Sequence, residues 1–357
     1  MSLWAVEGPC TPRCATDTGA RVPGTLAARR RAALLKTLLR ALAAGDRLAE
    51  PAVLGRLARE VLDGLGVRLE TRTETQPATP PEVPGTHPEM PVTATPPQAR
   101  ATHRRSPDGA RLSLPGPVGT LVVANHVSWL DVIALLAVEP GLAPLAKREV
   151  GGWPLIGALA RRLGVPFIDR DRPHRLPGAV AALAETLRSG RSVVVFPQAT
   201  TWCAPAGGAF RPATFQAAID AGAPVRPVSL DHLQDGRPSA VAAFLGDEDF
   251  TACLRRIAGA RGLAVRVTVH PPLPATGTDR RALAVRARRP VHGTAPPPGH
   301  TGTEPPPLGR TGTPPVATGT PPVVTGTPPG ATGTLSAAEP CPAPGRPLGA
   351  GIRSGVR

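Results

Sequence analysis

Apolar residues in the first part of the chain recur at the spacing of an amphipathic helix. In residues 25–44 a leucine face lies opposite Arg29, Lys36 and Arg40. The leucines that make this face are Leu34, Leu35, Leu38, Leu39 and Leu42. A second helix is predicted at residues 51–65, where a narrow apolar stripe faces charged residues and glycines end the pattern. The pattern therefore predicts an N-terminal amphipathic helical pair.

After residue 66, short apolar runs alternate with helical patterns. A half-exposed strand is predicted at residues 67–72. Buried strands are predicted at residues 121–124, 165–168, 192–196, 224–230, 241–245 and 263–269. Helices are predicted in the segment that ends near residue 137 and at residues 155–163, 176–187, 212–221 and 248–260. This alternation indicates an α/β fold with a mixed central sheet flanked by helices.

Two segments lack the apolar residues that a core requires. Proline, glycine and threonine concentrate at residues 71–117 and at residues 275–357, where Thr-Gly-Thr-Pro-Pro repeats. Such composition is typical of disordered chain, so we expect a disordered insert and a disordered tail. The expected parts are a leader (1–24), the helical pair with the first strand (25–70), the insert (71–117), the main domain (118–274) and the tail (275–357).

The charge of the chain indicates an anionic partner. Formal net charge is +15, from 41 Lys and Arg against 26 Asp and Glu. Aromatic residues are only 3% and no nucleic-acid-binding motif is present, so nucleic acid is not the expected partner. The arginine cluster at residues 29–31 favours an anionic membrane surface for the helical pair. Packing of the same pair on a core remains the alternative.

Cysteine usage and hydropathy bear on location. The 5 cysteines are scattered, which is typical of a reducing compartment. Cys10 and Cys14 have no second ligand pair, so no metal site is expected. No signal-peptide pattern and no apolar run long enough for a membrane span are present. We therefore expect a peripheral protein at the cytoplasmic face of the plasma membrane.

The segment Asn-His-Val-Ser-Trp-Leu-Asp at residues 125–131 carries the most chemical information. It places His126 in a turn between a predicted strand and a predicted helix, with Asp131 five residues later. An imidazole paired with a carboxylate is a general base near pH 7, able to deprotonate an alcohol that attacks a thioester. Ser128 and Asp131 also match a capping box, so a helix cap is an equally local explanation of the same residues.

Three later loops carry groups suited to an anionic ligand. Arg170 follows the predicted strand at residues 165–168 and could hold a phosphate. The turn at residues 196–201 offers backbone N–H groups and hydroxyls to an anion. Arg226 stands in a predicted buried strand, where a charge needs a partner or a ligand. In open α/β sheets such loops gather at one edge of the sheet.

These blocks, in this order, resemble the glycerolipid acyltransferases typified by 1-acylglycerol-3-phosphate acyltransferase. That family has an NHxSxxD block, a block that ends in arginine after a strand, an F-P-E-G-T block and a proline-containing apolar strand. Here the blocks match residues 125–131, 164–170, 196–201 and 223–228. The stretch at residues 210–228 also resembles bacterial members, and the resemblance covers roughly residues 26–273 outside the insert.

The resemblance implies roles for these residues. His126 deprotonates the acceptor hydroxyl, and Asp131 orients His126 and strengthens it. The acyl donor is acyl-CoA or acyl-ACP (acyl carrier protein), with no further cofactor, and the acceptor is a lysophospholipid such as 1-acylglycerol-3-phosphate. Residues 118–274 become the acyltransferase domain. The expected substrate-binding residues are Asn125, Ser128, Arg170, Phe196, Pro197, Gln198, Ala199, Thr200, Thr201 and Arg226.

The chain departs from the family at two positions of the third block. Gln198 and Ala199 stand where the family has glutamate and glycine. Glutamine loses the charge, and alanine resists the positive φ that glycine permits. Three functions therefore stay open: a phosphatidate-forming acyltransferase, an O-acyltransferase of lyso-ornithine lipid or another lysolipid, and a catalytically impaired lipid-binding homologue.

Overall fold

The apolar run at residues 121–124 forms the central strand of the sheet. This strand, β2 (Leu121–Ala124), is buried along its whole length because helices cover both faces of the sheet. It pairs in parallel with β6 (Val193–Val195) and with β7 (Val225–Gln234).

The computed structural model describes residues 8, 10–15, 19–74, 110–153, 155–169, 172–203 and 207–293.

The sheet is mixed, as the sequence predicts. Its strand order is β1-β9-β7-β2-β6-β3, and β8 pairs with β7. β9 is antiparallel to β7 and parallel to β1, whereas the strands beside β2 are parallel to it. A separate two-stranded sheet joins β4 to β5. The remaining strands are β1 (Arg68–Thr73), β3 (Ala143–Pro144), β4 (Ala146–Lys147), β5 (Phe167–Ile168), β8 (Arg237–Pro238) and β9 (Leu263–Val269).

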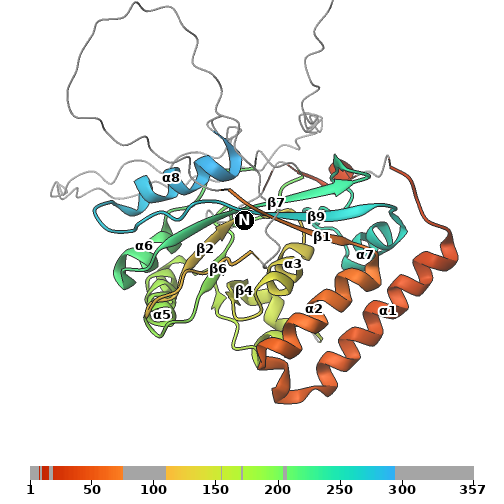
Figure 1. Ribbon diagram of the computed structural model, residues 1–357, viewed down its shortest axis with the longest axis horizontal. Coiled ribbons are helices and arrows are strands. Elements are labelled where there is room, and N and C mark those ends of the chain that lie inside the picture. Colours follow the sequence, from red (N-terminus) through yellow and green to blue (C-terminus); the bar gives the residue numbers. More distant parts are fainter. Residues whose placement is uncertain are drawn as a thin grey trace, which may run out of the picture.

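Helices pack on both faces of the sheet (Figure 1). Alternate residues of β2 point to opposite faces, so Val122 joins a core with α2, α3 and α7, whereas Val123 joins a core with α5, α6 and α8. The helices are α1 (Gly24–Ala43), α2 (Pro51–Leu65), α3 (Leu130–Val138), α4 (Ile156–Arg162), α5 (Leu176–Arg188), α6 (Ala213–Ala221), α7 (Phe250–Gly259) and α8 (Arg280–His292).

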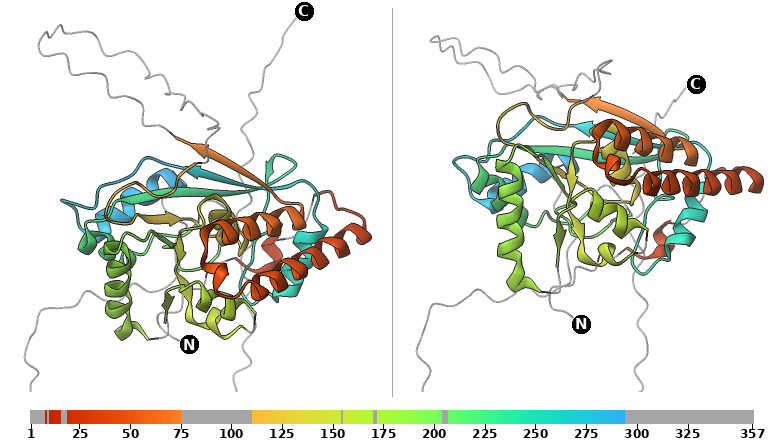
Figure 2. Two further views of the ribbon diagram at one scale, coloured as in Figure 1. Left: turned by 60° about the horizontal axis from the view of Figure 1, so that its bottom comes forward. Right: turned by 90° about the horizontal axis from the view of Figure 1, so that it is seen from below.

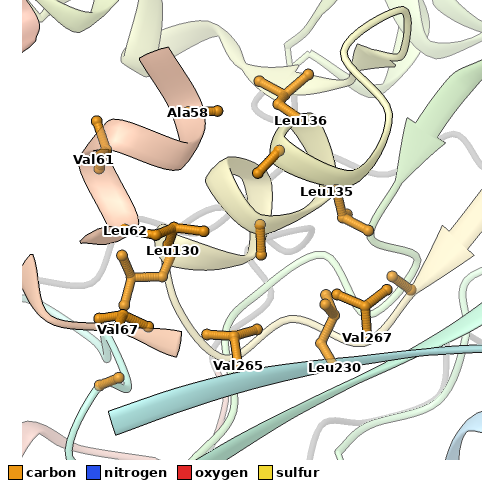
Figure 3. Packing of buried hydrophobic residues seen from close by; sticks show 14 of the residues in the cluster. Ala58, Val61, Leu62, Val67, Leu130, Leu135, Leu136, Leu230, Val265 and Val267 are labelled. Carbon is orange, nitrogen blue, oxygen red and sulfur yellow. The ribbon is translucent and has the colours of Figure 1, made fainter. Parts of the chain in front are cut away.

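The first of these cores holds α3 between α2 and the sheet (Figure 3). Leu130 of α3 is fully buried beside Leu62 of α2, in the same cluster as Val267 of β9. Burying one such side chain stabilises the fold by about 1.5–3 kcal/mol. The packing therefore fixes the start of α3, where Asp131 stands.

The predicted helical pair is confirmed, and α1 and α2 lie side by side along one flank of the molecule (Figure 2). The predicted leucine face of α1 is split. Leu34 packs in the core, whereas Leu35 and Leu39 are 55% and 54% exposed. Arg30 points inward, and its guanidinium donates hydrogen bonds to the carbonyls of Ala258 and Ala260. The outer face of α1 therefore combines exposed leucines with the remaining basic residues.

One predicted strand is wrong. Residues 241–245 are buried, as their apolar character indicates, but they form a turn and coil. The guanidinium of Arg256 donates hydrogen bonds to the carbonyls of Val241 and Ala243, which a strand would pair with a neighbour. An apolar run predicts burial, whereas pairing depends on which chain lies beside it.

The predicted edges of the insert and of the tail are too wide. Strand β1 extends to Thr73, and Leu112 is buried with its N–H donating to the carboxylate of Glu139. Ala275 is also buried, and α8 packs Leu283 into the second core. These segments are ordered by contacts with residues distant in the sequence, and amino-acid composition does not reveal such contacts. The rest of both predictions, residues 75–109 and 294–357, lies outside the described residues.

The predicted leader also contributes to the folded part. Cys10 and Ala15 are buried in a small cluster with Val127 and Trp202, next to the turn that carries His126. The Sγ atoms of Cys10 and Cys203 lie 3.1 Å apart. Part of the segment expected as a leader therefore packs against the loops at the carboxyl edge of the sheet.

Candidate active site

Three segments meet at the carboxyl edge of the parallel strands. His126 lies two residues after β2, and Phe196 directly follows β6. β7 continues beyond the end of β2. The Asn125 side chain donates to the carbonyl of Leu230 at 2.9 Å and accepts from its N–H at 2.7 Å. These two hydrogen bonds tie the His126 turn to β7.

His126 and Asp131 form a hydrogen-bonded pair. The distance from His126 Nδ1 to Asp131 Oδ2 is 2.8 Å. The same oxygen accepts the N–H groups of Val127 at 2.7 Å and Ser128 at 2.9 Å. The hydroxyl of Ser128 in turn accepts the N–H of Leu130 at 3.3 Å. Asp131 therefore stands in the first turn of α3, where its side chain accepts N–H groups of the preceding turn, and it is also the carboxylate beside His126.

The charge state of Asp131 determines the tautomer of His126. Asp131 is fully buried, and burial disfavours its charged form. Attraction to His232 and hydrogen bonds from both histidines outweigh burial and hold the pKa of Asp131 well below its usual range. An ionised carboxylate only accepts hydrogen bonds, so Nδ1 of neutral His126 carries the proton. Nε2 is then the nitrogen able to accept a proton.

A second histidine, which the sequence analysis missed, bonds to the other carboxylate oxygen. His232 Nε2 lies 2.6 Å from Asp131 Oδ1. The predicted strand ended at residue 230, but β7 extends to Gln234 and carries His232 past the end of β2. The sequence did contain a signal, because side chains alternate between the two faces of a strand. Val228, Leu230 and His232 therefore fall on one face of an extended strand.

The loop after β6 supports the His126 ring. Phe196 stacks on the imidazole, with ring centroids 4.0 Å apart and an interplanar angle of 17°. Gln198 Oε1 accepts the backbone N–H of His126 at 2.9 Å, and the His126 carbonyl accepts the N–H of Trp202 at 2.8 Å. Residues of and just after the third block therefore hold His126 by its backbone N–H and carbonyl and by its imidazole ring.

His126 lies in the wall of a cavity of about 1280 Å³. Much of the wall is apolar and comes from the helices α1, α2, α3 and α4. The cavity is also bordered by charged side chains, among them Lys147, Arg211 and Arg280. Acids also line it, namely Glu149, Asp169, Asp247 and Glu248, so a general base borders a space that combines apolar walls with charged groups of both signs. Among the described residues, no cluster of His, Cys, Asp and Glu is arranged to hold a metal ion.

Comparison with known proteins identifies the family. The family model described as Acyltransferase matches residues 113–231. The lyso-ornithine lipid O-acyltransferase of Pseudomonas aeruginosa is 40% identical over 183 residues, which are 50% of this chain and 69% of that protein. The chain belongs to the acyltransferase family. The family resemblance is thereby confirmed, and the protein is an enzyme of the acyl-transferring class.

Other relatives of this acyltransferase act on different lysolipids by name. The 1-acyl-sn-glycerol-3-phosphate acyltransferase of Neisseria meningitidis is 38% identical over 168 residues, 47% of this chain and 66% of that protein. The chain spans about two thirds of the length of this relative and of the Pseudomonas protein. The 1-acyl-sn-glycerophosphate (LPA) acyltransferase structure from Thermotoga maritima aligns at 16% identity and a TM-score of 0.44, over 74% of this chain and 95% of that one.

The expected substrate-binding residues of the acyltransferase fall into two groups. Asn125, Ser128 and Gln198 are buried, and their side chains bond to backbone groups of the site. These three side chains therefore hold the backbone of the site in place and do not line the cavity. The expected residues that line the cavity are Phe196, Pro197, Ala199, Thr200 and Thr201.

Two expected arginines remain. Arg226 is not among the described residues that line the cavity. Its Nη1 instead donates to the carbonyl of His270 at 2.9 Å, because its side chain leaves β7 well before the carboxyl edge. Its position does not match the expected contact with substrate. Arg170 lies outside the described residues.

Arg211 is a cavity residue that the sequence analysis did not single out. Its N–H donates to the carbonyl of Pro197 at 2.9 Å, so Arg211 is attached to the third block. Its side chain is exposed and lines the cavity. The arginine lay inside the family-like stretch at residues 210–228, which was the available signal.

The backbone at Ala199 has the conformation that the family glycine permits. Its φ is +62°, in the left-handed region that L side chains rarely adopt. The turn is nevertheless closed, with the Ala199 N–H donating to the Phe196 carbonyl at 3.0 Å. Alanine is therefore strained at a position where glycine would not be.

Ala199→Gly is expected to raise the free energy of unfolding by about 1 kcal/mol, because glycine removes the left-handed penalty of about 1–2 kcal/mol but loses more entropy on folding. Chemical denaturation of both proteins measures the difference. The matched control is Ala181→Gly, an exposed position in α5 where φ is helical. That change is expected to lower stability by about 1 kcal/mol. Equal effects at the two positions would show that Ala199 carries no strain.

Proposed function

We propose that this acyltransferase transfers a fatty acyl group from acyl-CoA or acyl-ACP to the free hydroxyl of a lysophospholipid. The observation that carries the proposal is the His126–Asp131 pair in the cavity wall, which leaves Nε2 of His126 to accept a proton. No described residue makes a hydrogen bond to that nitrogen. It is therefore available to an acceptor hydroxyl.

The chemistry balances without an acyl-enzyme. Nε2 of His126 takes the hydroxyl proton as the oxygen attacks the thioester carbonyl. The tetrahedral intermediate then collapses, the C–S bond breaks, and the thiolate leaves with the proton that His126 returns. Buried Asp131 stabilises the imidazolium that exists between the two transfers, since it stays a carboxylate throughout. The products are a diacyl lipid and free CoA or ACP thiol.

The shape of the cavity supports a lipid substrate. Its apolar wall includes Leu34 of α1, Leu57 of α2, Ile133 of α3 and Leu159 of α4. A space of about 1280 Å³ exceeds the typical upper volume of small-molecule pockets, about 1,000 Å³, and suits a long acyl chain.

Cationic groups of the cavity suit an anionic head group. Several cavity acids already have basic partners: Asp169 lies 2.7 Å from Arg148, and Glu248 pairs with Arg256. Arg211 borders the third-block loop and makes no ion pair with a described acid. We assign Arg211, with Thr200 and Thr201 of the same cavity wall, to the head-group phosphate or carboxylate. Arg170 remains a proposed phosphate ligand on the strength of the resemblance.

Phosphatidate formation from 1-acylglycerol-3-phosphate is our first choice of reaction. It is supported by the relatives named 1-acyl-sn-glycerol-3-phosphate acyltransferase. Acylation of lyso-ornithine lipid is the second choice, because relatives of that name are 40% and 30% identical to this chain.

Turnover with a panel of acceptors tests both choices. Purified protein is incubated with labelled acyl-CoA, or with acyl-ACP, and with lysophosphatidate, lyso-ornithine lipid or a zwitterionic lysolipid. The highest kcat/KM is expected with lysophosphatidate, and a preference for lyso-ornithine lipid would favour the second choice. No turnover on any acceptor, with turnover restored by Gln198→Glu, would favour the catalytically impaired lipid-binding homologue.

We further propose that the protein lies on an anionic membrane through the outer face of α1, at the cytoplasmic side. Leu26, Leu35 and Leu39 are exposed on that helix, among basic residues such as Lys36. Apolar side chains enter the interface while cations meet anionic lipid. Within the described part of the chain, every helix is too short or too polar to cross a bilayer.

Leu35→Asp combined with Leu39→Asp is expected to weaken binding to anionic vesicles at least about 10-fold, because both the apolar insertion and the charge attraction decrease. Vesicle co-sedimentation measures the partition. The matched control is Val285→Asp on α8, where the side chain is 72% exposed but lies at the other end of the molecule from α1 (Figures 1 and 2). Equal loss from both variants would indicate a general charge effect and contradict this surface.

A further inference from the structure

His232 reaches the active site from the far end of β7, four residues beyond the last residue of the fourth block. It stands in β7 two residues beyond Leu230, whose backbone is bonded to the Asn125 side chain in both directions. Its side chain is 4% exposed. Its backbone carbonyl accepts the N–H of Ser239, so the β7–β8 turn holds it in place. The strand and its turn therefore fix where the ring points.

The two oxygens of Asp131 are served by different parts of the chain. Oδ2 receives three donors, all from the first block, as described above. Oδ1 receives His232 Nε2 at 2.6 Å, and no other described residue hydrogen-bonds to that oxygen. Without His232, Oδ1 would be a buried oxygen lacking a donor, in a residue with no exposed surface. Such a group gains by turning toward another donor, which would move Oδ2 away from His126.

The surroundings of His232 are consistent with a donor at Nε2. Asp131 is the carboxylate that faces this nitrogen, and its pKa lies well below the usual range. The neighbouring residue in the strand, Asp231, has its pKa raised by burial, with Arg266, His232, His270 and Arg72 acting in the opposite direction. The carboxylate that His232 Nε2 contacts is therefore the firmly ionised one, whereas the adjacent acid in the strand is harder to ionise.

We propose that His232 is a positioning residue of the acyl-transfer reaction. Its Nε2–H holds Oδ1 of Asp131, so that Oδ2 stays directed at Nδ1 of His126 and Nε2 of His126 stays free to take the acceptor proton. The role rests on the proposed function, because it concerns the same general base. It differs from simple core packing because it depends on one donor atom at one position.

Two substitutions separate donation from packing. In His232→Gln the amide nitrogen occupies the place of Nε2 and still donates, whereas His232→Leu keeps an apolar buried side chain without a donor. His232→Leu is expected to lower kcat about 10-fold to 100-fold, as part of the general-base contribution, with KM for both substrates within about 2-fold. His232→Gln is expected to stay within about 3-fold of wild-type kcat. Equal losses in the two variants, or no loss in either, would overturn the proposal.

A double-mutant cycle shows whether His232 acts through Asp131. His232→Leu in an Asp131→Asn background is expected to add less than about 2-fold, because the carboxylate that it orients is already gone. Independent, multiplicative losses would contradict a role through Asp131. Thermal unfolding of each variant identifies any loss that comes from misfolding. If the Leu variant does not fold, the Gln variant alone decides: kcat within about 3-fold of wild type supports the proposal, and a larger loss in folded protein contradicts it.

A readout without turnover separates this inference from the proposed function. In protein labelled with ¹⁵N-histidine, the spectrum of His126 is expected to show the Nδ1–H tautomer in wild type and in His232→Gln, and a mixture of tautomers in His232→Leu. Assignment comes from the signal lost in His126→Ala. An unchanged tautomer in His232→Leu would refute the positioning role, whereas absence of wild-type turnover on every lysolipid would refute only the proposed function.

Discussion

His126→Ala is expected to lower kcat for acyl transfer by about 10²- to 10⁴-fold, the usual contribution of a positioned general base. The imidazole is the group in the cavity wall that is held by a buried carboxylate and retains a free nitrogen. KM is expected to change little, because the apolar wall that receives the acyl chain is untouched. Steady-state kinetics with acyl-CoA and the preferred lysolipid measure both constants.

The matched control for this variant is His174→Ala. His174 is exposed in a short 3-10 helix before α5 and does not line the cavity. The control is expected to retain wild-type kcat. Wild-type turnover in folded His126→Ala would disprove the mechanism, and circular dichroism of both variants establishes that they are folded.

Asp131→Asn is expected to produce the second large effect, lowering kcat at least about 10²-fold. The amide oxygen can replace Oδ2 as the acceptor for Val127 and Ser128, but the negative charge that stabilises the imidazolium is lost. The amide nitrogen would meet His232 Nε2, where an acceptor now stands. We also expect the free energy of unfolding at pH 7 to fall by about 2–4 kcal/mol, since several hydrogen bonds lose their charged acceptor.

The pH dependence of this stability difference has a defined sign. The pKa of Asp131 is depressed in the folded protein, so the carboxylate contributes stability above its unfolded pKa of about 3.9. That contribution begins to decline as pH falls below about 4 and is lost only as pH passes the lower folded pKa, so the difference between wild type and Asp131→Asn is expected to narrow progressively below pH 4. Chemical denaturation at pH 7 and below pH 4 measures this narrowing. The control Asp46→Asn, at an exposed position, is expected to change stability little at either pH.

Local periodicity predicted most of the architecture. The span predicted for α2 matches the structure, and so do those of β2 and β9. The hydrophobic pattern that defines each of these elements lies within the element itself, as in the buried apolar run of β2. The turn at residues 241–245 and helix α8 were not predicted, because their conformation depends on Arg256 and on the second core.

The candidate site divides in the same way. His126 and Asp131 are five residues apart, so one turn brings them together and the motif was visible in the chain. Arg211 and His232 had weaker signals, a family-like stretch and the period of a strand, and neither signal shows which residue lies across the fold. For Arg226 the sequence-based prediction was wrong. A charged residue in a buried strand suggested a ligand, but in the structure the Arg226 guanidinium bonds to a backbone carbonyl.

By itself the sequence determined the α/β class, the helical pair, the family and the pairing of His126 with Asp131. All of these depend on contacts between residues close in the chain or on the order of short motifs. Only the tertiary structure decided that Asp131 is bonded on both oxygens, that α1 divides its leucines between core and surface, and that Ala199 has a left-handed backbone. The physical reason is that each depends on what lies across the sheet or beside the helix: the second donor to Asp131 comes from a strand 101 residues further along the chain.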